Sequence, residues 1–166
     1  DSSNVAIKED LAKKAANYIF NGATIFMDGS STVRRIIKYI DKFKDLKIIT
    51  NNQRIFSECT HSHIKLYCTG GLFDSQNSIF FGNTAENYIN HTSADIFFFS
   101  SQAISNYGEI SDISEEETSL RKVMLSRSKK KIFLCDSSKL GLQKTFTLCN
   151  KDEVDLIICD KVLPWE

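Results

Sequence analysis

The sequence predicts an α/β fold in which a doubly wound, mostly parallel sheet is flanked by helices. Short, nearly continuous apolar runs rich in Ile and Phe recur along the chain, and such runs are typical of strands that are buried on both faces. Amphipathic segments alternate with these runs, which is the pattern of a parallel sheet whose crossovers are helical. Pro164, the single proline, lies near the end, and no repeat or low-complexity tract divides the chain. We therefore expect residues 1–166 to form one domain.

The elements are expected in alternating order. Strands are predicted at residues 24–27, 47–50, 64–69, 95–100, 131–135 and 155–159, where the apolar runs fall. Helices are predicted at residues 7–20, 32–41, 53–59, 83–90 and 115–128. In the first helix Ile7, Leu11 and Ala15 share one face, and Gly22 is a stop signal. Residues 72–81 are expected to add a small irregular hairpin.

Composition excludes several classes of protein. Lys plus Arg equals Asp plus Glu at 21 each, so this chain alone is a poor candidate for nucleic-acid binding. The five cysteines are odd in number and no two are closer than nine residues, which disfavours a disulfide framework. Cys68, Cys135 and Cys159 lie in apolar runs and are expected to be buried free thiols in a reducing, cytoplasmic compartment. The pair His61 and His63 lacks further ligands, so no metal or other cofactor is expected. The longest apolar run, 96–99, is too short to span a membrane, and we expect neither a signal peptide nor a membrane partner.

Residues 28–32, Asp-Gly-Ser-Ser-Thr, join a predicted strand to a predicted helix. A helix that starts at Ser31 or Thr32 leaves backbone N–H groups and a partial positive charge facing the loop, and the hydroxyls of Ser30, Ser31 and Thr32 add donors. The loop is therefore a candidate phosphate cradle that includes Asp28 and Gly29. The alternative is that these Ser and Thr side chains only cap the helix.

Other polar loops follow predicted strands and are expected at the same edge of the sheet. They contain Thr50, Asn51 and Asn52, then Gly70 and Gly71, then residues 100–102, and finally Asp136 to Lys139 with Asp160. Asparagine amides bind sugar hydroxyls, paired glycines admit a ligand close to the backbone, and lysine supplies a charge for phosphate. The loops together predict a site for a small, polar, anionic ligand such as a phosphorylated sugar.

The ordered motifs resemble those of a known family. The series consists of Asp28 to Thr32, Thr50 to Asn52, Gly70-Gly71, Gly82, Asp95, Glu117, Met124, Asp136 to Gly141 and Asp160. It resembles the C-terminal effector-sensing domain of DeoR-family transcriptional regulators over nearly the whole chain. The resemblance implies a fold related to ribose-5-phosphate isomerase and coenzyme A transferases, used as a sensor and not as an enzyme. It adds Asp95, Glu117 and Arg121 to the candidate ligand-binding residues.

The resemblance also implies partners. Family members carry an N-terminal winged helix-turn-helix that binds operator DNA, most often as repressors of sugar metabolism, and a phosphorylated sugar acts as effector. We expect that DNA-binding part to be missing from this chain, which starts at Asp1 without an initiator Met. The resemblance implies a homo-oligomer as well.

Departures from the family pattern leave alternatives open. Ser30 stands where many relatives have Gly, Asp74 stands where many have a basic residue, and Arg121 stands where Lys is common. Glu117 and Arg121 are spaced i,i+4, so they form either part of the ligand site or a surface ion pair. An isomerase using Asp28, Asp95 or Asp136 as general base is the alternative function. A dimerisation or scaffolding module whose polar loops are ordinary turns is the third.

Overall fold

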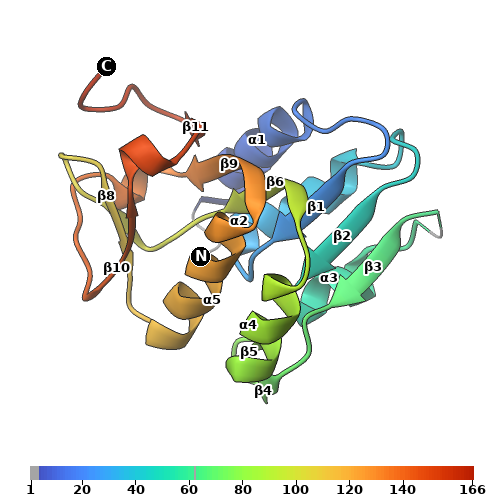
Figure 1. The fold of residues 1–166 in the computed structure, drawn as a ribbon. Helices are drawn as coiled ribbons and strands as arrows, with labels where there is room; N and C mark the ends of the chain where they lie inside the picture. The colour runs from blue at the N-terminus through green and yellow to red at the C-terminus, as the bar shows by residue number, and fades with distance from the viewer. Residues whose placement is uncertain (1–3, 62) are drawn as a thin grey trace.

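A six-stranded parallel sheet forms the centre of the molecule (Figure 1). The structure, a computed structural model, describes residues 4–61 and 63–166; residues 1–3, and Ser62 between the two histidines, lie outside the described part. The strands are β1 (Thr24–Met27), β2 (Lys47–Thr50), β3 (Lys65–Cys68), β6 (Ala94–Phe99), β9 (Ser128–Cys135) and β11 (Leu156–Cys159). Their order is β11-β9-β6-β1-β2-β3, and each neighbouring pair is parallel. The predicted sheet is confirmed.

The direction in which strands are added reverses at β1. The chain first places β2 and β3 on one side of β1 and later places β6, β9 and β11 on the other side. Strand β1 therefore pairs with both β2 and β6, and Phe26 lies level with Ile49 and Phe97. A crevice opens beyond the carboxyl ends of strands at such a reversal, because the two flanking loops leave in opposite directions.

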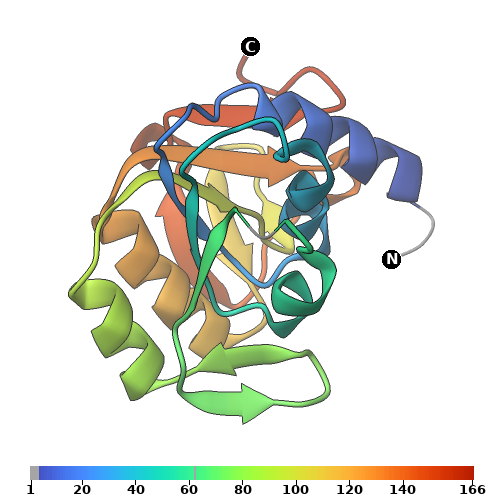
Figure 2. The ribbon, with the colours of Figure 1, turned by 90° about the vertical axis from the view of Figure 1, so that its right-hand side faces the viewer.

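Helices cover both faces of the sheet, as the doubly wound prediction requires (Figure 2). One face carries α1 (Val5–Ala16), α2 (Ser31–Arg34), the 3-10 helix η2 (Arg35–Tyr39) and α3 (Gln53–Glu58). The other carries α4 (Asn83–Asn90) and α5 (Glu115–Ser126). Short 3-10 turns, η3 (Ser137–Lys139) and η4 (Lys151–Glu153), follow β9 and β10. The first helix ends at Ala16, four residues before the predicted end, and leaves Tyr18 40% exposed.

A second, antiparallel sheet was not predicted. It consists of β7 (Ala103–Ile104), β8 (Glu109–Asp112) and β10 (Phe146–Asn150) in the order β10-β8-β7. These strands are short and mix polar with apolar residues, so they lack the continuous apolar run by which the other strands are recognised. The sheet buries Ile104, Ile110 and Leu148 in the same core cluster as α5.

A two-stranded hairpin, β4 (Leu72–Asp74) and β5 (Ile79–Phe81), forms where residues 72–81 predicted it. Gly71 allows this hairpin to lie close to α4. A Cβ atom at Gly71 would stand 2.5 Å from the carbonyl oxygen of Phe81 and 3.3 Å from the Cβ of Ala85, at a φ of +111°. Only glycine fits this approach without strain.

The cysteines are free thiols, and two of the three that were expected to be buried differ from the prediction, since Cys159 is half-buried and Cys68 is exposed. Cys135 and Cys149 are buried and Cys59 and Cys159 are half-buried, but Cys68 is exposed. Its expected burial was wrong because β3 is an edge strand with little cover. Within residues 4–61 and 63–166, no group of three His, Cys, Asp or Glu side chains fits a metal ion. No helix there is long and apolar enough to cross a membrane.

Candidate functional site

An open cavity of about 910 Å³ lies beyond the carboxyl ends of the central strands. Its volume is within the range of small-molecule sites. The loop after β1, the start of α3, residues 100–102 after β6, the turn after β9, the hairpin and the start of α5 all contribute to its wall. Of the predicted site residues, the cavity is lined by Gly29, Ser30, Ser31, Thr32, Asn52, Glu117, Arg121, Asp136 and Lys139.

Asp28 anchors the floor of this cavity. It is 1% exposed, and its carboxylate accepts hydrogen bonds from the backbone N–H groups of Ser30 and Ser100 and from Nε of Arg121, each at 2.9 Å. These three donors join the loop after β1 to the loop after β6 and to α5. Asp28 was predicted to contact ligand hydroxyls, but its side chain lies beneath the cavity and is occupied by protein donors.

The loop of residues 28–32 both caps a helix and lines the cavity. The Ser30 hydroxyl oxygen accepts a hydrogen bond from the backbone N–H of Val33 at 3.2 Å, so the capping interpretation holds for this residue. Gly29 is required because a Cβ atom there would stand 2.6 Å from Cγ2 of Ile79 in the hairpin. The hydroxyl oxygen of Ser31 accepts a hydrogen bond from Nζ of Lys8 at 3.1 Å.

Arg121 forms a buried ion network with three carboxylates. Its side chain is 6% exposed, and its nitrogens lie 2.9 Å from Asp28, 3.3 Å from Asp112 and 3.6 Å from Glu117. Burial by itself would lower the pKa of Arg121, but these carboxylates raise it above its usual value. The interpretation of Glu117 and Arg121 as a surface pair was wrong, because Arg121 lies on the face of α5 that packs toward the sheet. Removing the partner of such a buried charge typically costs about 3–5 kcal/mol.

Glu117 is left with little compensation for its charge. Burial raises its pKa, Arg121 lowers it, and the nearby carboxylates of Asp112 and Asp28 raise it again, so that it stays above the usual value of 4.5. One guanidinium is shared by three carboxylates. The wall formed by β8 and α5 is therefore electronegative even with Arg121 in place.

Several predicted site residues support the loops without lining the cavity. The Thr50 hydroxyl oxygen accepts from the backbone N–H of Asn52, and the Asn51 amide donates to the carbonyl of Phe80 at 3.0 Å. Gly70 and Gly71 stand where the chain enters the hairpin. Asn52 does line the cavity while its oxygen caps α3 by accepting from the backbone N–H of Arg54. In the structure Thr50, Asn51 and the two glycines shape the loops beside the cavity, and their contact with a ligand stays a prediction.

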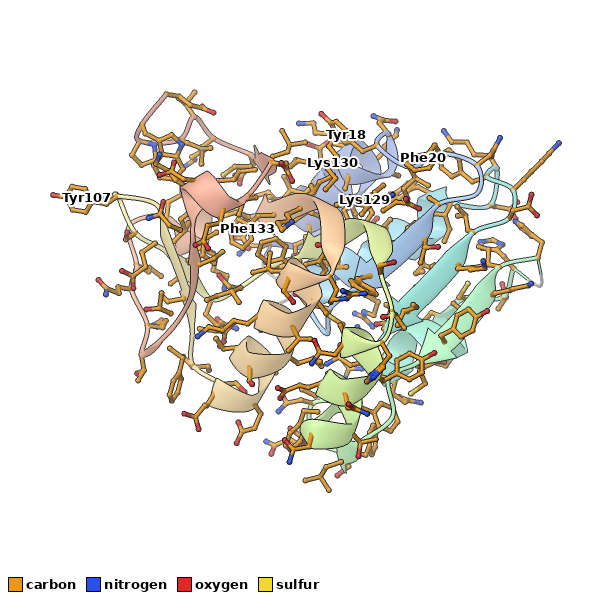
Figure 3. All side chains as sticks on the ribbon, viewed as in Figure 1. Tyr18, Phe20, Tyr107, Lys129, Lys130 and Phe133 are labelled. Atoms are coloured by element: carbon orange, nitrogen blue, oxygen red, sulfur yellow. The ribbon has the colours of Figure 1, made fainter. Side chains whose placement is uncertain are left out.

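Asp95 lies at the opposite edge of the sheet. It is the second residue of β6, and its carboxylate accepts from the backbone N–H of Thr24 at 2.8 Å, at the start of β1. Ser100, at the cavity, is five positions further along the chain, and a strand rises by about 3.3 Å per residue. The Oδ1 atom of Asp95 lies 3.8 Å from Nζ of Lys129. On the same surface, Nζ of Lys130 lies 4.8 Å from the centre of the Tyr18 ring (Figure 3). The structure does not bring Asp95 together with the other candidates.

Six charged residues of the cavity wall were not among the predicted site residues: Lys8, Arg34, Arg54, Asp74, Asp112 and Glu116. Lys8 carries a sequence signal, because it shares the i, i+3, i+4, i+7 face of α1 with Leu11, Ala12 and Ala15, all buried. A lysine on the buried face of a helix indicates a partner or a site. Asp112 ends a strand of the unpredicted second sheet, so no sequence pattern placed it.

Solved structures with the same fold define the class of this protein. Ribose 5-phosphate isomerase from Plasmodium falciparum matches with a TM-score of 0.58 and 22% identity, over 81% of this chain and 52% of that one. The delta subunit of eIF2B from Chaetomium thermophilum matches with a TM-score of 0.66 and 15% identity, over 93% and 55%. The chain is an α/β domain with the fold shared by these proteins.

Comparison with sequence families identifies the protein more specifically than its fold does. The family model "DeoR C terminal sensor domain" matches residues 3–161, so the chain belongs to this family. An uncharacterized HTH-type transcriptional regulator of Haemophilus influenzae is 33% identical over 95% of this chain and 61% of the relative. The regulator GolR of Listeria innocua is 29% identical, and a putative aga operon transcriptional repressor of Escherichia coli O157:H7 is 26% identical. The chain spans 60–62% of the length of these three relatives.

Proposed function

We propose that the chain is the effector-sensing part of a cytoplasmic transcriptional regulator of sugar metabolism and that its effector is a phosphorylated sugar. The observation that carries the proposal is the 910 Å³ cavity at the strand-order reversal, whose wall combines hydroxyls, amides and basic side chains. Membership of a sensor-domain family and relatives named as regulators and repressors support it.

In this proposal the effector acts through thermodynamic linkage between its own binding and the binding of operator DNA. A ligand that binds one conformation or oligomer more tightly shifts the population toward it, and the affinity for operator DNA changes with that population. Operator binding is assigned to a winged helix-turn-helix outside this chain, since Lys plus Arg balances Asp plus Glu at 21 each. A homo-oligomer is part of the same proposal.

Calorimetry with a panel of hexose 6-phosphates and pentose 5-phosphates, each beside its unphosphorylated parent sugar, tests the effector. At least one phosphorylated sugar is expected to bind and to raise the melting temperature, because a ligand that binds only the folded state stabilises it by about 2.7 kcal/mol at a hundred times its Kd. A folded domain that binds no member of the panel contradicts the proposal.

One observation favours a second candidate, a sugar-phosphate isomerase. Glu117 lines the cavity and has a raised pKa, which suits a general base for proton abstraction beside a carbonyl. Of the three bases considered from the sequence, only Asp136 lines the cavity, because Asp28 lies beneath it and Asp95 lies at the other edge. Steady turnover of ribose 5-phosphate that is abolished by Glu117→Gln or Asp136→Asn would establish the isomerase.

A further inference from the structure

Two cysteines stand side by side at the carboxyl ends of β9 and β11. Cys135 is the last residue of β9, Cys159 is the last residue of β11, and the two are register partners in neighbouring parallel strands (Figure 1). Both pack with the core cluster on the α5 face of the sheet, so their side chains lie on the same side. Neighbouring strands are about 4.8 Å apart, which is within the range of roughly 4.4–6.8 Å that a disulfide spans between Cα atoms.

The two thiols differ in burial and in acidity. Cys135 is fully buried, whereas Cys159 is half-buried on β11, an edge strand of the sheet. A hydrogen bond with Cys135 lowers the pKa of Cys159 to about 7, although burial and the charge of Asp160 act in the opposite direction. The same hydrogen bond, together with burial, raises the pKa of Cys135. The pair therefore has one accessible sulfur that ionises first and one protonated neighbour that supports the thiolate.

The other cysteines have different surroundings. Cys149 is buried in the same core cluster, but it lies on β10 opposite Ile110, and burial raises its pKa to about 12. Cys59 follows α3, where burial also raises its pKa. Cys68 lies on β3, at the other edge of the central sheet. Cys149 is thus a matched control for a buried thiol of the same core.

We propose that Cys135 and Cys159 form a redox-sensitive dithiol, which a peroxide converts into a disulfide that joins β9 to β11. The Cys159 thiolate attacks one peroxide oxygen, an S–O bond forms, the O–O bond breaks, and the leaving hydroxide takes up the proton that Cys159 released. The sulfur of Cys135 then attacks the sulfenic sulfur, an S–S bond forms, the S–O bond breaks, and the second hydroxide takes the Cys135 proton. Two thiols are oxidised, one peroxide is reduced, and two waters are released when the peroxide is hydrogen peroxide.

The disulfide lies next to loops at the border of the cavity. Asp136 follows Cys135 directly and lines the cavity, as Lys139 does. The backbone N–H and the hydroxyl of Ser137 donate to the carboxylate of Asp160 at 2.6 and 2.8 Å, so the loops after β9 and β11 are already in contact. Oxidation adds a covalent tie between the two strands at this point. The inference does not depend on the identity of the effector, and its test needs no effector.

Peptide mapping by mass spectrometry tests the proposal. Trypsin places the five cysteines in separate peptides, 55–65, 66–121, 132–139, 145–151 and 152–161. The folded chain is treated with hydrogen peroxide, its remaining thiols are blocked with N-ethylmaleimide, and the digest is measured before and after dithiothreitol. Peptides 132–139 and 152–161 are expected to be linked about tenfold more often than any other pair, because sulfurs held together react as a unimolecular system.

Variants separate the roles of the two sulfurs. Cys135→Ala is expected to leave Cys159 as a sulfenic acid that dimedone traps, with no link. Cys149→Ala removes a buried thiol of the same core cluster and is expected to keep the link at the wild-type yield. If Cys135→Ala does not fold, Cys159→Ala at its half-buried position takes its place and is expected to leave Cys135 unoxidised.

Several results would overturn the proposal. A dominant link that includes Cys149, sulfinic acid at Cys159 without a link, or five intact thiols under conditions that fully oxidise dithiothreitol would each do so. The preference is expected to disappear in the urea-unfolded chain, because Cys149 lies between the other two in sequence and closes shorter loops with each. An equal preference in urea would show that the fold does not create the dithiol.

Discussion

Arg121 and its carboxylates illustrate how single residues set the properties of the site. The i,i+4 spacing predicted contact between Glu117 and Arg121, and that contact is present at 3.6 Å. The spacing did not predict Asp28, 93 residues away in the chain, whose carboxylate lies 2.9 Å from Arg121. This distant partner turns a helix-surface pair into a buried network.

Replacement of Glu117 by Gln is expected to raise the melting temperature at pH 7. The pKa of Glu117 is raised in the folded state above 4.5, so its ionised form disfavours folding at any pH above the folded pKa. The gain from Glu117→Gln should shrink as the pH falls through the folded pKa and vanish below about 4.5, where the carboxyl is protonated in both states. Thermal melts of Glu117→Gln and the wild type between pH 4 and pH 8 measure this gain in melting temperature.

The matched control is Glu115→Gln, an exposed glutamate in the same first turn of α5. Loss of its favourable interaction with the helix N-terminus costs a few tenths of a kcal/mol. A Glu117→Gln variant that is less stable than Glu115→Gln at pH 7 would show that the contact with Arg121 outweighs burial.

The elements around the cavity are held in place by close packing between the hairpin and the loops that follow β1 and β2. The hairpin of β4 and β5 touches the loop after β1 through Ile79 and the loop after β2 through the backbone of Phe80, whose N–H donates to Asn51 at 2.9 Å. Its residues Asp74, Gln76 and Asn77 line the cavity. A shift of this one element therefore alters the shape of the site without changing any predicted binding residue.

Gly71→Ala is expected to destabilise the protein more than Gly82→Ala. Both glycines have positive φ, at +111° and +95°, so each alanine adds backbone strain of about 1–3 kcal/mol. Only at Gly71 would the new methyl also clash, 2.5 Å from the Phe81 oxygen, and overpacking adds about 1–3 kcal/mol. Urea unfolding of the two variants gives the difference. Equal destabilisation would mean that the hairpin shifts freely to admit the methyl.

At the scale of the whole molecule, the six-stranded sheet has a hydrophobic core on each of its faces. Alternate residues of β6 enter different cores: Phe98 packs with α1 and the residues of that face, whereas Phe97 and Phe99 pack with α5 and the second sheet. All three side chains are fully buried. Because both cores share the backbone of the same strands, we expect them to unfold together.

Phe97→Ala and Phe98→Ala are each expected to lower the free energy of unfolding by about 3–5 kcal/mol, the usual cost of removing a buried aromatic ring. Each variant should still unfold in one transition when it is followed by circular dichroism and by Trp165 fluorescence. Two separate transitions in either variant would show that the two layers are independent folding units.

The sequence by itself determined the parallel sheet, the alternation of helices and strands and the set of polar loops at one edge. These follow from local information, since apolar runs, helical periodicity and turn residues are read from neighbours along the chain. The tertiary structure alone decided the second sheet, the buried surroundings of Arg121, the remote position of Asp95 and the entry of Lys8 into the cavity. Each of these depends on contacts between segments that are far apart in sequence, and such contacts are fixed by packing and not by local pattern.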